Sequence, residues 1–152
     1  MPNKFTMIAL PSEIHLESFA VLQSHYEFNP PKRDPRNIQQ LFKSYEIDVD
    51  FAHHIGEDNS VQVFTKISVN QIDKPKYGYK LFVEGVAVFS LDKNVELTPD
   101  EEKNLKFYST VNILIGYLRN TLTALTASAP MGPYLLPPLN MSDLFRKKSE
   151  SK

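Results

Sequence analysis

The chain has 152 residues, of which 41% are hydrophobic, and its 17 basic and 18 acidic residues give a formal net charge of −1. This length and apolar content suit one domain that builds its own core. Because the two charge signs are scattered along the chain, the basic surface that binds nucleic acid is excluded. The absence of cysteine excludes disulfides, thiol catalysis and cysteine-ligated metal sites, so we expect a cytoplasmic protein.

The sequence predicts neither a signal peptide nor a membrane-spanning segment. The first ten residues lack a continuous apolar segment followed by a small-residue cleavage site, because Pro11 and Glu13 follow directly, so no signal peptide is expected. The longest apolar stretch near the C-terminal half, Val111 to Ala129, contains Arg119 and several polar side chains, which a bilayer core penalises. We therefore expect no membrane insertion.

The first predicted strand lies near the N-terminus. Lys4 to Val21 is rich in Phe, Ile, Leu and Val, and Pro11 divides it into Phe5–Leu10 and Ile14–Val21. Both pieces show alternating character, so the pattern predicts one long bent strand or two short ones.

A crossover loop and an amphipathic strand follow. Prolines 30, 31 and 35 exclude regular structure from Asn29–Pro35, and Ile38–Lys43 could form a helical turn just after it. In Tyr45–Ala52, apolar residues alternate strictly with polar ones, which predicts a strand with one wet face. That face carries an acidic row, which is either a solvated surface or a partner-docking surface: Glu46, Asp48 and Asp50.

Two further strands complete a predicted sheet. Gly56–Asn59 has the composition of a turn, and the alternation from Val61 to Asn70 predicts a second strand that pairs with the acidic one. After a turn around Pro75, Tyr77–Leu91 predicts another strand. Its middle, Val83–Phe89, is apolar on both faces, as in a central or doubly covered strand.

A long helix is predicted from Pro99 to Ser128. Thr98 is a suitable N-cap, Pro99 suits the first helical position, and Glu101 can close a capping box. Apolar residues then recur at intervals of three and four, in a stripe wider than packing on one sheet requires. A second packing partner is therefore expected for this helix, which indicates an oligomer interface.

The C-terminal segment begins where Pro130–Pro133 ends the helix. Tyr134–Leu139 is an apolar extended segment, and Asn140–Phe145 can begin a short helix. Arg146–Lys152 is charged and serine-containing, so we expect an unstructured tail. The sequence thus predicts a single domain over residues 1–145.

Two motifs in this region, Asn112–Arg119 and Pro133–Phe145, resemble the SecB family of protein-export chaperones. The resemblance implies an α+β fold: a four-stranded antiparallel sheet with a crossover after the first strand, packed on one long C-terminal helix with a short terminal helical turn. It also implies a homotetramer, a dimer of dimers. The implied activity is ATP-independent capture of unfolded precursor proteins, kept translocation-competent for delivery to the motor SecA.

The residues and the resemblance together give three groups of site residues. An apolar client groove is expected, with ordinary core packing as the alternative for each residue, at Phe28, Phe42, Tyr45, Phe51, Phe64, Tyr134, Leu135, Leu136, Leu139 and Met141. SecA docking is expected at Glu13, Glu17, Phe82 and Glu84. The oligomer interface on the long helix is expected at Tyr108, Asn112, Ile115, Tyr117, Arg119 and Leu122.

The chain departs from the family pattern in three places. Gly116 stands where the family has proline, so a helix kink is either kept through flexibility or lost. The sequence continues for only seven residues after Phe145, which shortens the second helix of the family. Phe82 falls where an acid is expected, and Glu84 lies two residues on, on the same strand face.

Other functions have less support in the sequence. Adjacent His53 and His54 point to opposite faces of a strand and cannot share a metal ion, so no metal site is expected. No nucleophile elbow, acid pair or Gly-rich phosphate loop is present, so neither an enzyme nor a cofactor is expected. The alternatives are a SecB-like chaperone dedicated to the antitoxin of a toxin–antitoxin pair, an oligomeric adaptor without chaperone activity, and a small-molecule binding domain.

Overall fold

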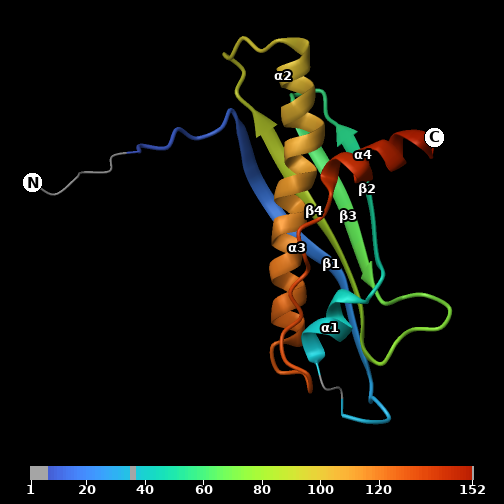
Figure 1. Ribbon diagram of the computed structural model, residues 1–152. Coiled ribbons are helices and arrows are strands. Elements are labelled where there is room, and N and C mark those ends of the chain that lie inside the picture. Colours follow the sequence, from blue (N-terminus) through green and yellow to red (C-terminus); the bar gives the residue numbers. More distant parts are fainter. Residues whose placement is uncertain (1–6, 35–36, 152) are drawn as a thin grey trace, which may run out of the picture.

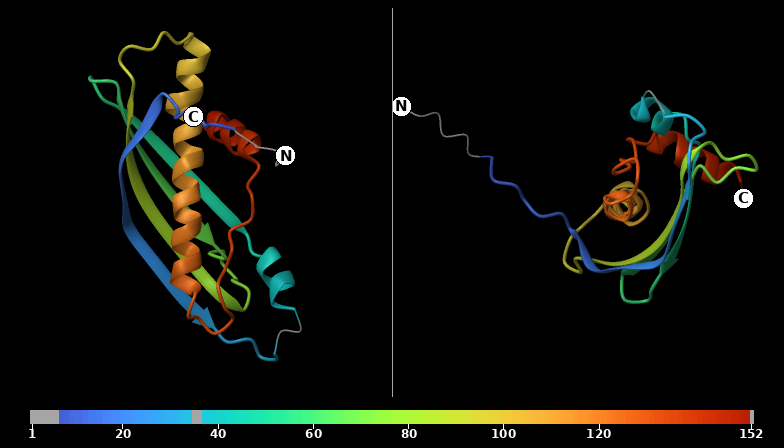
Figure 2. Two further views of the ribbon diagram at one scale, coloured as in Figure 1. Left: turned by 90° about the vertical axis from the view of Figure 1, so that its left-hand side faces the viewer. Right: turned by 90° about the horizontal axis from the view of Figure 1, so that it is seen from below.

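In the computed structural model, which describes residues 7–34 and 37–151, an antiparallel sheet curves around one long helix (Figures 1 and 2). The strands are β1 (Ile14–Asn29), β2 (Ile47–Ile55), β3 (Ser60–Val69) and β4 (Gly78–Leu91). The helical segments are α1 (Ile38–Lys43), α2 (Pro99–Lys103), η1 (Asn104–Ser109), α3 (Thr110–Thr126) and α4 (Met141–Glu150). The sheet order is β1-β4-β3-β2, which confirms the predicted four-stranded sheet with a crossover after the first strand.

The first strand begins and ends later than the sequence predicted. β1 pairs with β4 from Ile14 to Asn29, through two register shifts, because the long β4 offers backbone partners well beyond Val21. The predicted strand at Phe5–Leu10 is wrong for residues 7–10, which have no strand structure and are exposed. Residues 5 and 6 lie outside the described residues.

The centre of the core lies under β4. On the helix side of this strand, Leu81, Val83 and Phe89 are fully buried, whereas the alternate residues on the outer face are half-buried. The central position is therefore confirmed, but the helical layer covers only one face. The contact with α3 is close: a Cβ atom at Gly85 would lie 2.7 Å from Cδ2 of Leu118.

The predicted long helix is confirmed as one continuous rod made of α2, η1 and α3 (Figure 1). Thr98 caps it, with its Oγ1 accepting a hydrogen bond from the Glu101 amide at 3.2 Å. α3 continues through Gly116 without interruption, because glycine keeps the N–H that proline lacks. The sequence did not predict that residues 104–109 adopt π-helical geometry.

Beyond α3 the chain returns along the same helix, as both views in Figure 2 show. Nε of Arg119 donates to the Leu136 carbonyl at 3.0 Å, and the Tyr134 amide donates to Oγ1 of Thr126 at 2.8 Å. These bonds hold an otherwise extended segment against the rod. They carry the chain to the start of α4, beside the opposite edge of the sheet from β1.

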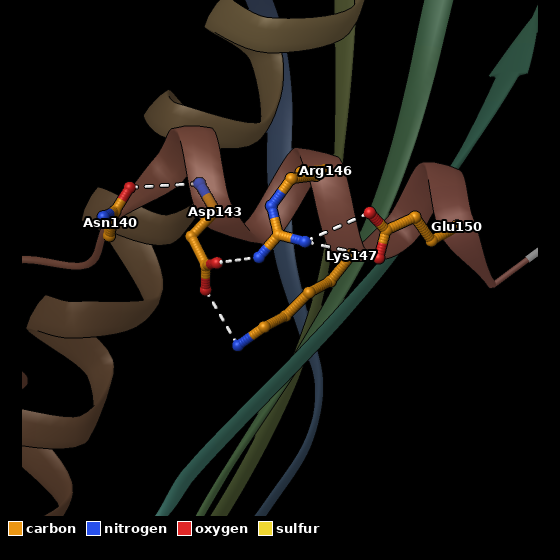
Figure 3. Close-up of polar contacts among 5 residues, drawn as sticks. All are labelled: Asn140, Asp143, Arg146, Lys147 and Glu150. Carbon is orange, nitrogen blue, oxygen red and sulfur yellow. Dashed lines mark hydrogen bonds and ion pairs between the residues drawn. The ribbon is translucent and has the colours of Figure 1, made fainter.

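The prediction of an unstructured tail is wrong for Arg146–Glu150, which belongs to α4. Figure 3 shows the reason. Asn140 Oδ1 caps the helix by accepting from the Asp143 amide at 3.0 Å, and Arg146 bonds Asp143 at 2.6 Å and Glu150 at 3.1 Å. Lys147 pairs with Asp143 at 2.8 Å. Hydrogen bonds from Lys147 and Arg146 lower the pKa of Asp143, and such pairs support a helix that buries no residue completely.

Candidate polypeptide-binding groove

An aromatic groove of about 630 Å³ lies between the sheet edge at β2, the N-terminal part of the helical rod, and α4. Its lining residues come from three elements far apart in the sequence: Phe51, Ala52, His53, Lys103, Phe107, Tyr108, Phe145, Lys148 and Ser149. Rings form most of its walls, and two lysines lie among the lining residues. A second hollow of about 550 Å³ lies along another side of α4, with Phe51 and Lys148 lining both.

Phe145 joins the walls of the groove. Its ring packs edge-to-face on Phe51, with centroids 5.3 Å apart, and on Tyr108, at 4.6 Å. Phe51 is 7% exposed, but Phe107 remains 36% exposed at the opening. The groove therefore offers an accessible aromatic surface above a rigid aromatic base.

The π-helical segment η1 forms the wall opposite α4 and is fixed to the sheet. Nε2 of His53 donates to the Phe107 carbonyl at 3.1 Å, and the two rings pack with centroids 5.0 Å apart. Nζ of the nearly buried Lys106 donates to Asn59 at 3.1 Å and to Glu102 at 2.6 Å. π-Helical turns are frequent at functional sites because they change the direction of neighbouring side chains.

The free edge of the sheet runs along this groove. β2 pairs with β3 on one side only. At its ends, even-numbered residues make the backbone hydrogen bonds: the Gly56 amide donates to Ser60, and the Asn70 amide donates to Glu46. Since hydrogen-bonding residues alternate along an antiparallel strand, the odd-numbered residues of β2 direct their N–H and C=O groups toward the free edge.

One of these edge groups is capped by an acidic side chain. The Phe51 amide donates to Oδ1 of the preceding Asp50 at 2.9 Å, and the same oxygen accepts from Nζ of Lys148 on α4 at 2.7 Å. The Lys148 ammonium also lies 5.5 Å from the centroid of the Phe51 ring. Its hydrogen bond is the main cause of the lowered pKa of Asp50. Asp50 and Lys148 together close the strand edge beside the groove.

This ion pair makes the polar contact between α4 and β2 dependent on pH. Because the pKa of Asp50 is lowered in the folded protein, its contribution is present above the ordinary carboxyl pKa and is lost as pH falls through the lowered value. We expect the Lys148–Asp50 contact to be lost as pH falls from about 4, the ordinary carboxyl value, through the lowered pKa of Asp50. In amide NMR spectra, residues near Lys148 should then shift in the native chain, and Asp50→Asn should show the shifted positions already at neutral pH. Identical titration of both proteins would contradict this assignment.

The predicted client-binding residues fall into different parts of the structure. Five are buried: Phe42, Tyr45, Phe51, Tyr134 and Leu136. Three are half-buried: Phe28, Leu139 and Met141. Phe64 and Leu135 are exposed at 36% and 66%. Of the ten, Phe51 lines the aromatic groove and Leu139 lines the second hollow.

The other aromatic residues near the crossover pack on one another. Phe42 contacts the rings of Tyr45, Tyr79 and Tyr134 with centroids 5.4–5.8 Å apart. Burial raises the pKa of Tyr134 to about 12. These side chains form the part of the core that lies between α1 and the sheet, and Phe42 of α1 belongs to it. They are therefore not available to a client in this conformation.

The residues expected to dock SecA do not form one acidic patch. Glu17 lies at a register shift of β1, where it accepts a hydrogen bond from Ser90. Glu84 lies six residues before Ser90 on β4, a separation of about 20 Å along a strand. Glu84 is opposite Lys66 on the outer face. Phe82 is two positions from Glu84, and Glu13 precedes β1.

The predicted interface residues on the helix have different surroundings. Ile115 and Leu122 are 2% and 0% exposed in the core of their own chain, so neither can contact a second copy. Arg119 holds the returning segment and Tyr108 lines the groove. Asn112 is exposed, and so is Tyr117. Of the six predicted residues, Asn112 and Tyr117 offer the most exposed surface for association.

Sequence patterns did not identify Lys103, Phe107, Phe145 or Lys148 as parts of the groove. Two weak signals were present in the sequence. Phe145 belongs to the C-terminal motif, and Phe107 directly precedes Tyr108, a predicted interface residue. The position of Phe107 depends on the π-helical turn, which the regular spacing of a helix does not reveal. Lys148 lay in the segment expected to be unstructured.

The described residues contain neither a candidate metal site nor a helix that could cross a membrane. Within residues 7–34 and 37–151, no group of three or more His, Asp or Glu side chains is placed to hold a metal ion. Over the same ranges, every helix is too short or too polar to cross a bilayer.

The fold is that of SecB-like proteins. The structure aligns with the SecB-like chaperone Rv1957 of Mycobacterium tuberculosis, solved in complex with a ChAD peptide from the Rv1956 HigA1 antitoxin, with a TM-score of 0.51 and 15% identity. The alignment covers 84% of this chain and 91% of the other. The four-stranded sheet, long helix and short terminal helix agree with this neighbour.

Other comparisons add similarity without a known function. An uncharacterised protein of Methanocaldococcus jannaschii, MJ0357, is 23% identical over 145 residues, covering 93% of this chain and 90% of its own length. A protein of unknown function from Streptococcus agalactiae aligns over 84% of this chain and 98% of its own, with a TM-score of 0.48 and 12% identity. No protein-family profile matches the sequence.

Proposed function

We propose that this protein is a SecB-like, ATP-independent chaperone that binds unfolded polypeptide segments in the aromatic groove without chemically changing them. The observation that carries the proposal is the accessible groove beside an unpaired strand edge, on a fold shared with a SecB-like chaperone. An extended chain can supply both apolar side chains for the rings and backbone groups for the edge. The role belongs in the cytoplasm, where such clients are synthesised.

Two kinds of client are proposed. The antitoxin of a toxin–antitoxin pair is favoured by the structural neighbour, whose complex contains an antitoxin peptide. Unfolded precursors delivered to SecA are the second kind. The outer face gives this role less support, because Glu17 and Glu84 are separated and Lys66 faces Glu84.

The test of the proposal is suppression of aggregation. Purified full-length protein should reduce light scattering by two unrelated unfolding proteins, such as citrate synthase and malate dehydrogenase, without nucleotide. Suppression of neither would leave an oligomeric adaptor as the better interpretation. Binding to SecA and to an antitoxin's C-terminal segment, measured on the same preparation, separates the two client types.

A homotetramer, assembled as a dimer of dimers, forms part of the proposal. β1 is a 16-residue strand at the other edge of the sheet, and long uncovered edges favour pairing with another chain. Val21 and Leu22 are 41% and 48% exposed there. Nearby, Phe19 stacks on Tyr117 with centroids 4.9 Å apart. A second copy of the chain would cover these side chains and the edge of β1.

We expect Leu22→Asp combined with Tyr117→Asp to yield smaller oligomers, because charges would be buried between copies. Multi-angle light scattering at micromolar concentration gives the mass directly. Phe64→Asp is a suitable control, since Phe64 lies on β3, away from β1. A monomeric native protein would eliminate the proposed assembly while leaving the groove intact.

A further inference from the structure

We propose that an extended client segment pairs with the free edge of β2 as a fifth strand, displacing the Asp50–Lys148 contact. One of its side chains then enters the aromatic groove, and the preferred segment carries a carboxylate beside that apolar residue. This inference rests on the proposed chaperone function and specifies its mode of binding and its client class.

The geometry of β2 places the edge and the groove in register. The residues whose backbone groups face the free edge are the odd-numbered ones, and the groove-lining Phe51 and His53 are among them. Side chains of directly opposed residues lie on the same face of a sheet. A client residue that exchanges backbone hydrogen bonds with Phe51 would therefore direct its own side chain into the groove.

The edge is closed by a contact that can open without unfolding. α4 buries none of its residues completely, and its polar contact with β2 is the ion pair between Lys148 and Asp50. The bonds that maintain the helix lie within it or at its cap, as Figure 3 shows for Asn140, Asp143 and Arg146. The Lys148–Asp50 contact can thus open while α4 stays intact and Phe145 stays packed on Phe51 and Tyr108. Its opening would free both the strand edge and the cation.

The charges around the groove select the client. Lys103 lines the groove, and within residues 7–34 and 37–151 it makes no ion pair. Once Asp50 is displaced, Lys148 is a second cation on the same groove. A carboxylate two residues from the inserted apolar side chain, on the same strand face, would be attracted to these ammonium groups. A lysine at that position would be repelled.

The decisive probe is the capped peptide Thr-Phe-Thr-Glu-Thr-Phe-Thr-Glu-Thr, which presents Phe and Glu on one face when extended. N-methylation of its two Phe amides removes the N–H groups that would pair with β2, whereas N-methylation of two Thr amides removes outward-facing ones. We expect the first change to weaken binding to the full-length protein by ~10-fold or more, and the second to have little effect. Replacing both Glu residues by Lys should also weaken binding.

Matched variants of the protein test the closing contact. Asp50→Asn should bind the unmodified peptide about two- to fivefold more tightly, because the competing ion pair is weakened. Asp48→Asn, on the same face of β2, should leave the affinity unchanged. Lys103→Ala should weaken binding of the Glu peptide but not of its Gln counterpart.

The outcomes separate this inference from the function beneath it. If the protein suppresses aggregation but the two methylated peptides bind equally, or the unmodified peptide does not bind, strand addition is wrong and the chaperone proposal stands. Equal binding of Glu and Lys peptides contradicts the proposed client charge. If neither peptides nor unfolded proteins bind, the proposed function fails and this inference fails with it.

Discussion

Replacing Phe107 by alanine is expected to weaken the binding of unfolded clients by about tenfold, because a central aromatic side chain of an interface commonly contributes 1–2 kcal/mol or more. Phe107 is 36% exposed at the opening of the groove, and its carbonyl is held by His53. Truncation would remove the accessible ring and leave the backbone bond in place. Fluorescence anisotropy with a labelled unfolded client measures the loss directly.

Phe64 provides an unusually close control for this change. It is also 36% exposed, and it was predicted from the sequence as a client-binding residue. Phe64 lies on β3 with its neighbours Asp50, Ala52 and Glu84, and it does not line the aromatic groove. Phe64→Ala should therefore bind clients like the native protein. Equal losses in both variants would show that clients also use the outer face, whereas a loss in Phe64→Ala alone would exclude the groove.

The second large effect is expected in stability. Leu118 is 0% exposed and packs closely on Gly85, where an added Cβ atom would lie 2.7 Å from its Cδ2. Leu118→Ala removes buried apolar atoms and leaves a cavity in a contact that cannot close freely, so we expect a loss of about 2–5 kcal/mol in the free energy of unfolding. Urea denaturation followed by circular dichroism provides the measurement.

Leu135 serves as the control for that experiment. Its side chain is 66% exposed on the returning segment, and it has the same size and shape as Leu118. Leu135→Ala should change the free energy of unfolding by no more than about 0.5 kcal/mol. A loss below about 1 kcal/mol in Leu118→Ala would mean that the helix and the sheet pack less tightly than their geometry indicates.

Local patterns were sufficient for the sheet and the long helix. The strict alternation around Phe51 predicted β2, and the Thr98-Pro99 start with regular apolar spacing predicted the rod, because both patterns depend on residues near one another in sequence. The division of the N-terminal segment at Pro11 predicted the bounds of β1 less accurately. β1 extends to Asn29 because β4 supplies a partner along its length, and such pairing depends on residues 49 to 77 positions away.

The candidate site was harder to predict from the sequence than the fold. Of the predicted client residues, Phe42, Tyr45 and Tyr134 lie near one another in the structure, where they form a buried cluster. The sequence does not show whether an aromatic side chain packs in the core or lies at the opening of a groove. Exposure is decided by what covers the residue, and that information is not local.

The sequence by itself determined the α+β class, the order of the strands along the chain and the long helix, because periodicity and capping act over a few residues. Only the tertiary structure decided that the π-helical turn brings Phe107 beside β2, and that Lys148 reaches Asp50 across 98 positions. It also changed the expected tail into α4. The physical reason is that a groove is made by surfaces from separate elements, and their relative placement follows from packing of the whole chain.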